Sequence, residues 1–193
     1  IIMPTEDTQK AGFFDYIAQN EGLRLKPYKD IKGFGTIGYG HLIKKGEQFT
    51  SITKKRAKEL FDQDLKHAIS VVKDDIGEMH WGMLPDEVQI ALADMAFRTD
   101  WQKSPTAKGH FKNEDYFASA KEYLDSDEYR KSKAEGTGIA PRMERNANII
   151  VNLGNARQDA MSYTEAVEDR LRLEELQRDP QHPANVQRRK RKK

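Results

Sequence analysis

Three side chains near the N-terminus have the types and the spacing that hydrolysis of a glycosidic bond requires. They are Glu21, Asp30 nine positions later, and Thr36 six positions after that. One carboxyl group must be protonated, because it donates a proton to the leaving oxygen. The other must be ionised, to stabilise positive charge on the sugar or to direct a water molecule, and a hydroxyl can hold that water. These two roles require two different environments for the carboxyl groups.

A helix is expected directly before Glu21. Apolar side chains recur there at helical spacing: Phe13, Phe14 and Ile17. With Thr8 as N-cap, the pattern predicts a helix over about residues 9–20. Gly22 is a typical helix stop, so Glu21 would lie at the C-terminal end of the helix. The negative end of the helix dipole favours the protonated form of a carboxyl group, which suits a proton donor.

A β-hairpin is expected directly after it. Apolar side chains in two short runs predict strands on either side of a turn at residues 30–33: Leu23, Leu25 and Tyr28, then Phe34 and Ile37. Four glycines in the second half permit close approach of the backbone: Gly33, Gly35, Gly38 and Gly40. We expect this ribbon to line a cleft.

The stretch EGLRLKPYKD, followed by TIGYGHLI, resembles the phage-type lysozyme family, the peptidoglycan muramidases typified by the endolysin of T-even phages. The resemblance continues more weakly through FDQDLKHAI, ALADMAF and APRMER, so it covers roughly residues 11–163. It implies that Glu21, Asp30 and Thr36 are catalytic. It also implies cleavage of the β-1,4 bond between N-acetylmuramic acid and N-acetylglucosamine, and Thr36 suggests that the reaction inverts the anomeric configuration.

Other interpretations of these motifs are less specific. Two carboxylates at this spacing are usually a solvated surface pair, and glycine-rich hairpins are usually structural. The glycines match no phosphate-binding loop. For His41, the resemblance implies a stabilising pair with Asp64, and the alternative is a catalytic base. We favour the structural role.

Several positions depart from the family or bear on its substrate. We predict that Leu42, Phe97 and Arg98 bind substrate. Arg98 stands where the family usually has glutamine, and it is either a contact for peptide carboxylates or a solvated surface charge. The chain between His41 and Asp64 is shorter than in the family, which suggests that a helix of the small lobe is missing or reduced. Arg142 and Arg145 stand where the family carries two arginines, and Glu128 where it carries tryptophan.

The composition is that of a soluble, globular protein. Of the 193 residues, 37% are hydrophobic and 33% are charged, with no apolar run near 18 residues that would predict a transmembrane segment. No N-terminal segment resembles a signal peptide. The absence of cysteine fits a reducing compartment. The five histidines lack ligand spacing, so we expect no metal and no cofactor.

The predicted fold class is α+β and mostly helical. A small lobe with a β-hairpin, about residues 20–55, would be joined by a long helix, capped by Thr53 and ended by Gly77, to an all-α lobe at about residues 77–163. Pro85 would open a core helix within its first turn, and further helices are expected at about 114–125 and 141–152. We assign residues 1–10 to an N-terminal segment and 11–163 to the lysozyme domain.

Residues 164–193 are expected to form a charged helix and a disordered basic tail. Ser162 and Glu165 form a capping box that would open the helix, which runs to about residue 178. Residues Arg188 to Lys193 are all basic, and they outweigh the net charge of +2 of the whole chain. The tail is either an arm for anionic envelope polymers or nucleic acid, or a solubilising end. We expect a monomer, unless the chain is part of a virion.

The biological setting has two alternatives. A free endolysin would be made in the bacterial host cytoplasm and would reach the cell wall through a separate pore. A virion-associated lysozyme would use the same chemistry during entry, and its C-terminal extension would dock on virion proteins.

Overall fold

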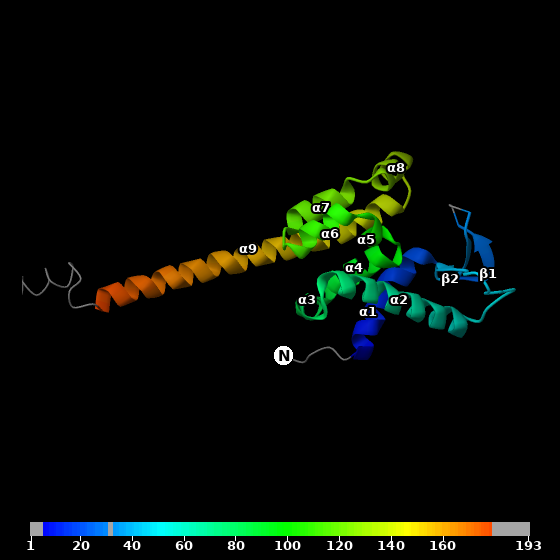
Figure 1. Cartoon of the computed structure of the whole chain (residues 1–193), viewed down its shortest axis with the longest axis horizontal. Helices are drawn as coiled ribbons and strands as arrows, with labels where there is room; N and C mark the ends of the chain where they lie inside the picture. Colours follow the sequence, from blue (N-terminus) through cyan, green and yellow to red (C-terminus); the bar gives the residue numbers. More distant parts are fainter. Residues whose placement is uncertain (1–5, 31–32, 179–193) are drawn as a thin grey trace, which may run out of the picture. The chain divides into compact units, whose positions relative to one another are not determined.

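The structure is a computed structural model that describes residues 6–30 and 33–178, with side chains from 12–30 and 33–175. The described part contains nine helices and three strands, in the α+β, mostly helical class predicted from the sequence (Figure 1). The chain divides into two compact units, residues 1–151 and residues 152–193. The predicted functional side chains all belong to the first unit.

Helix α1 (Glu6–Glu21) ends at the predicted proton donor. Gly22 takes a φ of +68°, and its N–H donates to the carbonyl of Ala18, so the predicted helix stop is confirmed. The N-terminal end differs from the prediction, because Thr8 lies inside the helix and not at its cap. A threonine near a helix start is only a weak signal, since it is also tolerated within the first turns.

The hairpin is confirmed and is extended by a third strand. The antiparallel sheet has the order β1–β2–β3, with β1 at Arg24–Lys29, β2 at Gly35–Gly38 and β3 at His41–Leu42. Thr36 of β2 lies opposite Tyr28 on one side and Leu42 on the other. The two-residue strand β3 was not predicted, because so short a strand has no alternation to detect.

Helix α2 (Lys54–Ile76) has the predicted boundaries. The side chain of Thr53 accepts from the N–H of Arg56, and Gly77 ends the helix with a φ of +88°. Its buried face packs on the sheet and on α4 (Figure 1). The rings of Phe14, Phe61 and Tyr39 pack edge to face and tie α1, α2 and the sheet together. The loop between β3 and α2 has no helix, as the short spacing predicted.

The rest of the first unit is helical. Its elements are α3 (Glu78–Met83), α4 (Asp86–Phe97), α5 (Asp100–Lys103), α6 (Pro105–Lys112), α7 (Tyr116–Leu124) and α8 (Asp127–Glu135). Helix α4 is the predicted core helix, with nearly every side chain from Val88 to Ala96 buried. Pro85 is its N-cap and not a first-turn residue. Helix α7 confirms the predicted helix near 114–125, whereas α3, α5, α6 and α8 were not predicted.

The last helix, α9, runs without interruption over Ile139–Arg178. The predicted end before Gly154 is therefore wrong, and so is the predicted new helix opened by Ser162. Gly154 has no positive φ, so it continues the helix at a propensity cost of about 1 kcal/mol. A capping box is also compatible with a helix interior, because Ser162 and Glu165 can both face solvent there. The basic run at 188–193 lies outside the described residues.

The second unit contains the C-terminal part of α9. Its exposed surface there includes five large apolar side chains: Met161, Tyr163, Val167, Leu171 and Leu173. Among the described residues, no helix combines the length and the apolar character of a membrane span.

Candidate active site

The carboxyl group of Glu21 has two oxygens in different surroundings. Oε1 accepts a hydrogen bond of 2.7 Å from Nη1 of Arg142, which projects from α9. Oε2 faces Gly40, because a Cβ built on that glycine would lie only 2.8 Å from it. Gly40 has a φ of +86°, so both its backbone conformation and this close approach require glycine. One oxygen is therefore bound to a cation and the other lies against bare backbone.

Asp30 follows β1 and is held by the turn of the hairpin. Its Oδ1 accepts from the N–H of Phe34 at 2.8 Å, and its own N–H donates to the carbonyl of Phe34 at 3.0 Å. The N–H of Gly33 donates to the Asp30 carbonyl, which closes the turn. The backbone of the hairpin therefore holds this side chain.

Thr36 is almost fully buried, with 3% of its surface exposed. Its hydroxyl donates to the carbonyl of Phe34 at 3.1 Å. A hydroxyl has one proton and two lone pairs, so the Thr36 oxygen can still accept a hydrogen bond. Asp30 and Thr36 are thus both bound to the backbone of Phe34.

Tyr28 lies near all three predicted catalytic residues. Burial raises the pKa of its phenol, and the nearby carboxylates of Glu21 and Asp30 raise it further. The phenol therefore lies within electrostatic reach of both carboxyl groups and stays neutral at physiological pH. It is also the cross-strand neighbour of Thr36. By sequence, Tyr28 is only an apolar residue of the predicted strand.

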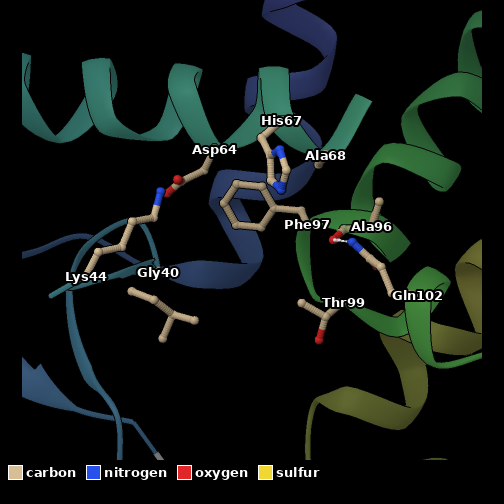
Figure 2. A pocket seen from close by; sticks show the side chains of 10 residues that line it. Gly40, Lys44, Asp64, His67, Ala68, Ala96, Phe97, Thr99 and Gln102 are labelled. Atoms are coloured by element: carbon tan, nitrogen blue, oxygen red, sulfur yellow. Dashed lines mark hydrogen bonds between the residues drawn. The ribbon is translucent and has the colours of Figure 1, made fainter. Parts of the chain in front are cut away.

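A pocket of about 210 Å³ lies among the sheet, α2 and the end of α4 (Figure 2). Gly40, which contacts Glu21, belongs to its lining, and so do Leu42 and Phe97. Leu42 is 48% exposed. Figure 2 shows the side chains of Asp64 and His67, which line the pocket from α2. Lys44, which follows β3, also lines it. The pocket therefore offers apolar surface together with one acidic and two basic side chains. Glu21, Asp30 and Thr36 are not in its lining, and Gly40 is the lining residue that Oε2 of Glu21 faces.

Arg98 does not line this pocket. Its Nε donates to Oδ2 of Asp100 at 3.0 Å, and Nη2 lies 3.5 Å from Oε1 of Glu128. Burial lowers the pKa of the guanidinium, but the contact with Asp100 outweighs this, so the pKa is raised. With 13% exposure, Arg98 is not a solvated surface charge. That alternative is wrong, and the predicted contact with substrate stays a prediction.

His41 is buried between two carboxylates. Its Nδ1 lies 2.6 Å from Oδ2 of Asp64, which confirms the predicted pair. Its Nε2 lies 3.1 Å from Oε2 of Glu47, a partner that the sequence did not reveal. The same oxygen of Glu47 accepts from the N–H of Lys44 at 2.8 Å. Both ring nitrogens are therefore engaged in holding β3 and the following loop to α2, which is a structural role.

Arg142 and Asp94 were not among the predicted site residues. Asp94 is fully buried in the middle of α4, and it accepts hydrogen bonds from Nε and Nη2 of Arg142. Its sequence signal was an aspartate inside the apolar run IALADMAF. A charge in such a run needs a partner. Arg142 was noted only as an arginine of the family pattern.

In the described part of the chain, no three histidine, aspartate or glutamate side chains gather where they could hold a metal ion. The expectation of no metal and no cofactor stays a prediction. The arrangement around Glu21 suits proton transfer, since Arg142 donates to Oε1 and, among the described residues, no hydrogen bond to Oε2 is present. The backbone-held pair of Asp30 and Thr36 suits the orientation of a water molecule.

The sequence is similar to known proteins over much of its length. The sequence model of a family described as phage lysozyme matches residues 18–146, which is more than half of the chain. A curated relative, the pre-baseplate central spike protein Gp5 of Enterobacteria phage T4, is 33% identical over a region that covers 50% of this chain. That region is 20% of the relative, so the chain matches only a small part of its length.

Proposed function

The chain belongs to the phage lysozyme family, and we propose that it hydrolyses the β-1,4 bond between N-acetylmuramic acid and N-acetylglucosamine in peptidoglycan. Membership of the family supports an enzyme of the glycoside hydrolase type. The observation that carries the proposal is the setting of Glu21. One oxygen of its carboxyl group is bound to Arg142, and the other lies against Gly40, which lines the pocket.

In this proposal Glu21 is the proton donor. The oxygen that faces Gly40 would carry the proton, because Arg142 already donates to the other one. The glycan would lie along the pocket, with Leu42 and Phe97 as apolar contacts for its rings. Tyr28 would keep a neutral phenol between the two carboxyl groups, where it can donate a hydrogen bond to sugar or water.

Asp30 and Thr36 would prepare the attacking water. The Thr36 proton is bound to the carbonyl of Phe34, so its oxygen would accept a hydrogen from the water and turn a lone pair toward the anomeric carbon. A retaining enzyme uses a carboxylate as nucleophile with the two carboxyl groups ~5–5.5 Å apart, and that scheme gives a hydroxyl no role. A water between them requires a gap of ~6.5–9.5 Å and inverts the configuration.

Proton NMR of the first-formed product tests the stereochemistry. Inversion of a β-linked glycan gives an initial α-anomer, before the sugar equilibrates in solution. An initial β-anomer would overturn the role proposed for Thr36.

The proton-donor role is tested by Glu21→Gln. This variant keeps the shape of the side chain and an acceptor for Arg142, but it cannot donate an acidic proton. We expect loss of wall clearing in a turbidity assay and an unchanged circular dichroism spectrum. Glu135→Gln, the same charge change on the surface of α8, is the control and should clear walls at the wild-type rate. More than a few per cent residual activity in Glu21→Gln would refute the assignment.

The biological setting is proposed from the relative. That relative is a central spike protein, which favours the virion-associated alternative over a free endolysin. In that setting the C-terminal extension would dock on virion proteins, and the exposed apolar side chains of α9 between residues 161 and 173 would supply the contact. Mass spectrometry of purified particles tests this. Peptides of the chain should be present in stoichiometric amounts in the particle, whereas an endolysin would be found only in the lysate.

A further inference from the structure

Arg142 is shared by two carboxylates from different helices. Toward α1, Nη1 donates to Oε1 of Glu21 at 2.7 Å. Toward α4, Nε donates to both oxygens of Asp94, at 3.2 and 3.1 Å, and Nη2 donates to Oδ1 at 2.5 Å. Both Arg142 and Asp94 are buried, so their charges are poorly screened by solvent. The guanidinium therefore binds Glu21 in the candidate active site and Asp94 in the buried core of α4.

Asp94 is itself fixed by neighbouring side chains. Oδ2 of Asp94 accepts from the side-chain amide of Asn146 at 2.7 Å. The amide oxygen of Asn146 in turn accepts from the hydroxyl of Tyr16 at 2.9 Å. Tyr16 lies on α1, the same helix that ends at Glu21. The network thus returns to the proton donor's own helix and leaves Asp94 little freedom to move.

An arginine beside a proton donor presents a problem. A guanidinium favours the ionised form of a neighbouring carboxyl group, and an ionised carboxylate has no proton to donate. Burial lowers the pKa of Arg142, but hydrogen bonds from it to Asp94, and then the charge of Glu21, raise the pKa above its ordinary value. Arg142 is therefore always a cation, and the effect on Glu21 depends on whether its charge is balanced elsewhere.

Asp94 supplies that balance. With Asp94 ionised, the three side chains have zero net charge when Glu21 is protonated and −1 when it is ionised. Without the charge of Asp94, Arg142 and Glu21 together would have zero net charge only when Glu21 is ionised, so the cation would favour loss of the Glu21 proton. Other ionisable groups nearby do not replace it. Burial raises the pKa of Tyr16, Tyr28 and Tyr123, so they stay neutral. The cations Arg98 and Arg145 donate to Asp100 and to the side-chain oxygen of Asn20. The carboxylate of Asp30, which with Glu21 raises the pKa of Tyr28, accepts from the N–H of Phe34.

We propose that Asp94 is a positioning residue for the hydrolysis: by holding and neutralising Arg142, it lets Glu21 keep the proton that it donates, on the oxygen facing Gly40. The inference rests on the proposed function, because it assigns Asp94 a task only if Glu21 is the proton donor. It goes further by placing a determinant of the reaction in the core of α4, outside the pocket.

The test is the pH dependence of cleavage of soluble peptidoglycan fragments, measured as kcat and KM. Asp94→Asn removes the charge with little change of shape. We expect the alkaline limb of the kcat profile to move to lower pH by about one unit, the shift that a nearby uncompensated charge produces. KM should change little, because Asp94 does not line the pocket. Asp75→Asn is the matched control, since Asp75 also accepts from buried or half-buried donors but lies at the far end of α2.

A double variant separates charge from structure. Arg142→Gln should move the alkaline limb to higher pH, and Asp94→Asn combined with Arg142→Gln should return the limb toward its wild-type position. If Asp94→Asn alone does not fold, the same information comes from comparing Arg142→Gln with the double variant, because the limb should fall when the Asp94 charge is removed. A purely structural role would lower activity in all variants without these opposite shifts.

These experiments test the role of Asp94 separately from the proton-donor role of Glu21. An active Glu21→Gln variant would overturn the proposed function. An inactive Glu21→Gln variant, together with a folded Asp94→Asn variant whose alkaline limb is unmoved, would overturn the role of Asp94 alone. A limb that moves equally in the Asp75→Asn control would also overturn it, since the shift would then follow from a general loss of stability.

Discussion

Replacement of Gly40 by alanine tests the geometry of the candidate site most directly. The new Cβ would lie 2.8 Å from Oε2 of Glu21, closer than side-chain atoms approach in folded proteins. The carboxyl group must then move by several tenths of an ångström. Because Arg142 holds Oε1 from the other side, that movement also strains a 2.7 Å hydrogen bond. The substitution therefore displaces the proposed proton donor without changing its chemistry.

Two effects of different size are expected. A left-handed backbone costs a non-glycine residue about 1–2 kcal/mol, which corresponds to a fall in Tm of roughly 2–8 °C for a chain of this size. A displacement near 1 Å of a catalytic group can reduce the rate about 10²-fold. We expect Gly40→Ala to lose between ~10-fold and ~100-fold in kcat at a temperature where the variant is fully folded.

Gly46→Ala is the matched control for the backbone effect. Gly46 has a φ of +96°, and a Cβ there would meet no heavy atom within 4 Å. It should lose similar stability and keep its activity. The assay is wall clearing per folded molecule, with Tm measured by circular dichroism. If Gly40→Ala clears walls as fast as Gly46→Ala at equal folded fraction, the close approach of Gly40 to Glu21 has no effect on catalysis.

Three further substitutions test other contacts. Glu47→Gln should lower stability by about 1 kcal/mol at pH 7. The Lys44 N–H and His41 lower the folded pKa of Glu47, so this stabilisation is present above the unfolded pKa of ~4.3 and should vanish in melts as pH falls through the folded value. Asp75→Ala leaves the buried indole N–H of Trp101 without its acceptor and should cost about 1–3 kcal/mol in urea unfolding at pH 7. Burial raises the pKa of Asp75, but hydrogen bonds from Lys108 and Trp101 lower it overall. The charge-dependent part of the stability lost in Asp75→Ala should therefore shrink as pH falls below ~4. A loss of stability that grows in acid would contradict the role of the Asp75 carboxylate as acceptor. Leu42→Ala, at an exposed pocket position, should raise KM several-fold while stability stays within about 0.5 kcal/mol, and an unchanged KM would remove Leu42 from the substrate contacts.

Much of the local structure could be predicted from the sequence, because it depends on neighbours in the chain. The boundaries of α2 follow from a threonine cap and a glycine stop, and both act within four residues. The hairpin follows from alternating apolar residues and from glycines that permit its tight turn. The end of α1 at Glu21 follows from Gly22. The grouping of Asp30 and Thr36 around the backbone of Phe34 is therefore largely contained in one short stretch.

Local patterns failed where they permit two structures. Gly154 and the Ser162 capping box suggested a helix break, but α9 continues through both. A single glycine lowers helix stability without ending the helix, and a cap residue is also tolerated in a solvent-exposed helix interior. Helices α3, α5 and α6 were missed for a related reason, since one or two turns contain too few residues to show a helical period. Helix α8 was missed because its sequence, DEYRKSKAE, has no apolar stripe.

The surroundings of the reactive side chains were decided by tertiary structure. Arg142 is 121 residues from Glu21 and 48 residues from Asp94, so no local pattern relates the three. By sequence, Arg98 could be a substrate contact or a surface charge, and only the folded structure shows it bound to Asp100 of α5 and near Glu128 of α8. Residue types and spacing thus predict which groups could exchange a proton or orient water. Which of their oxygens is bound, and by what charge, depends on chain segments that meet only in the folded protein.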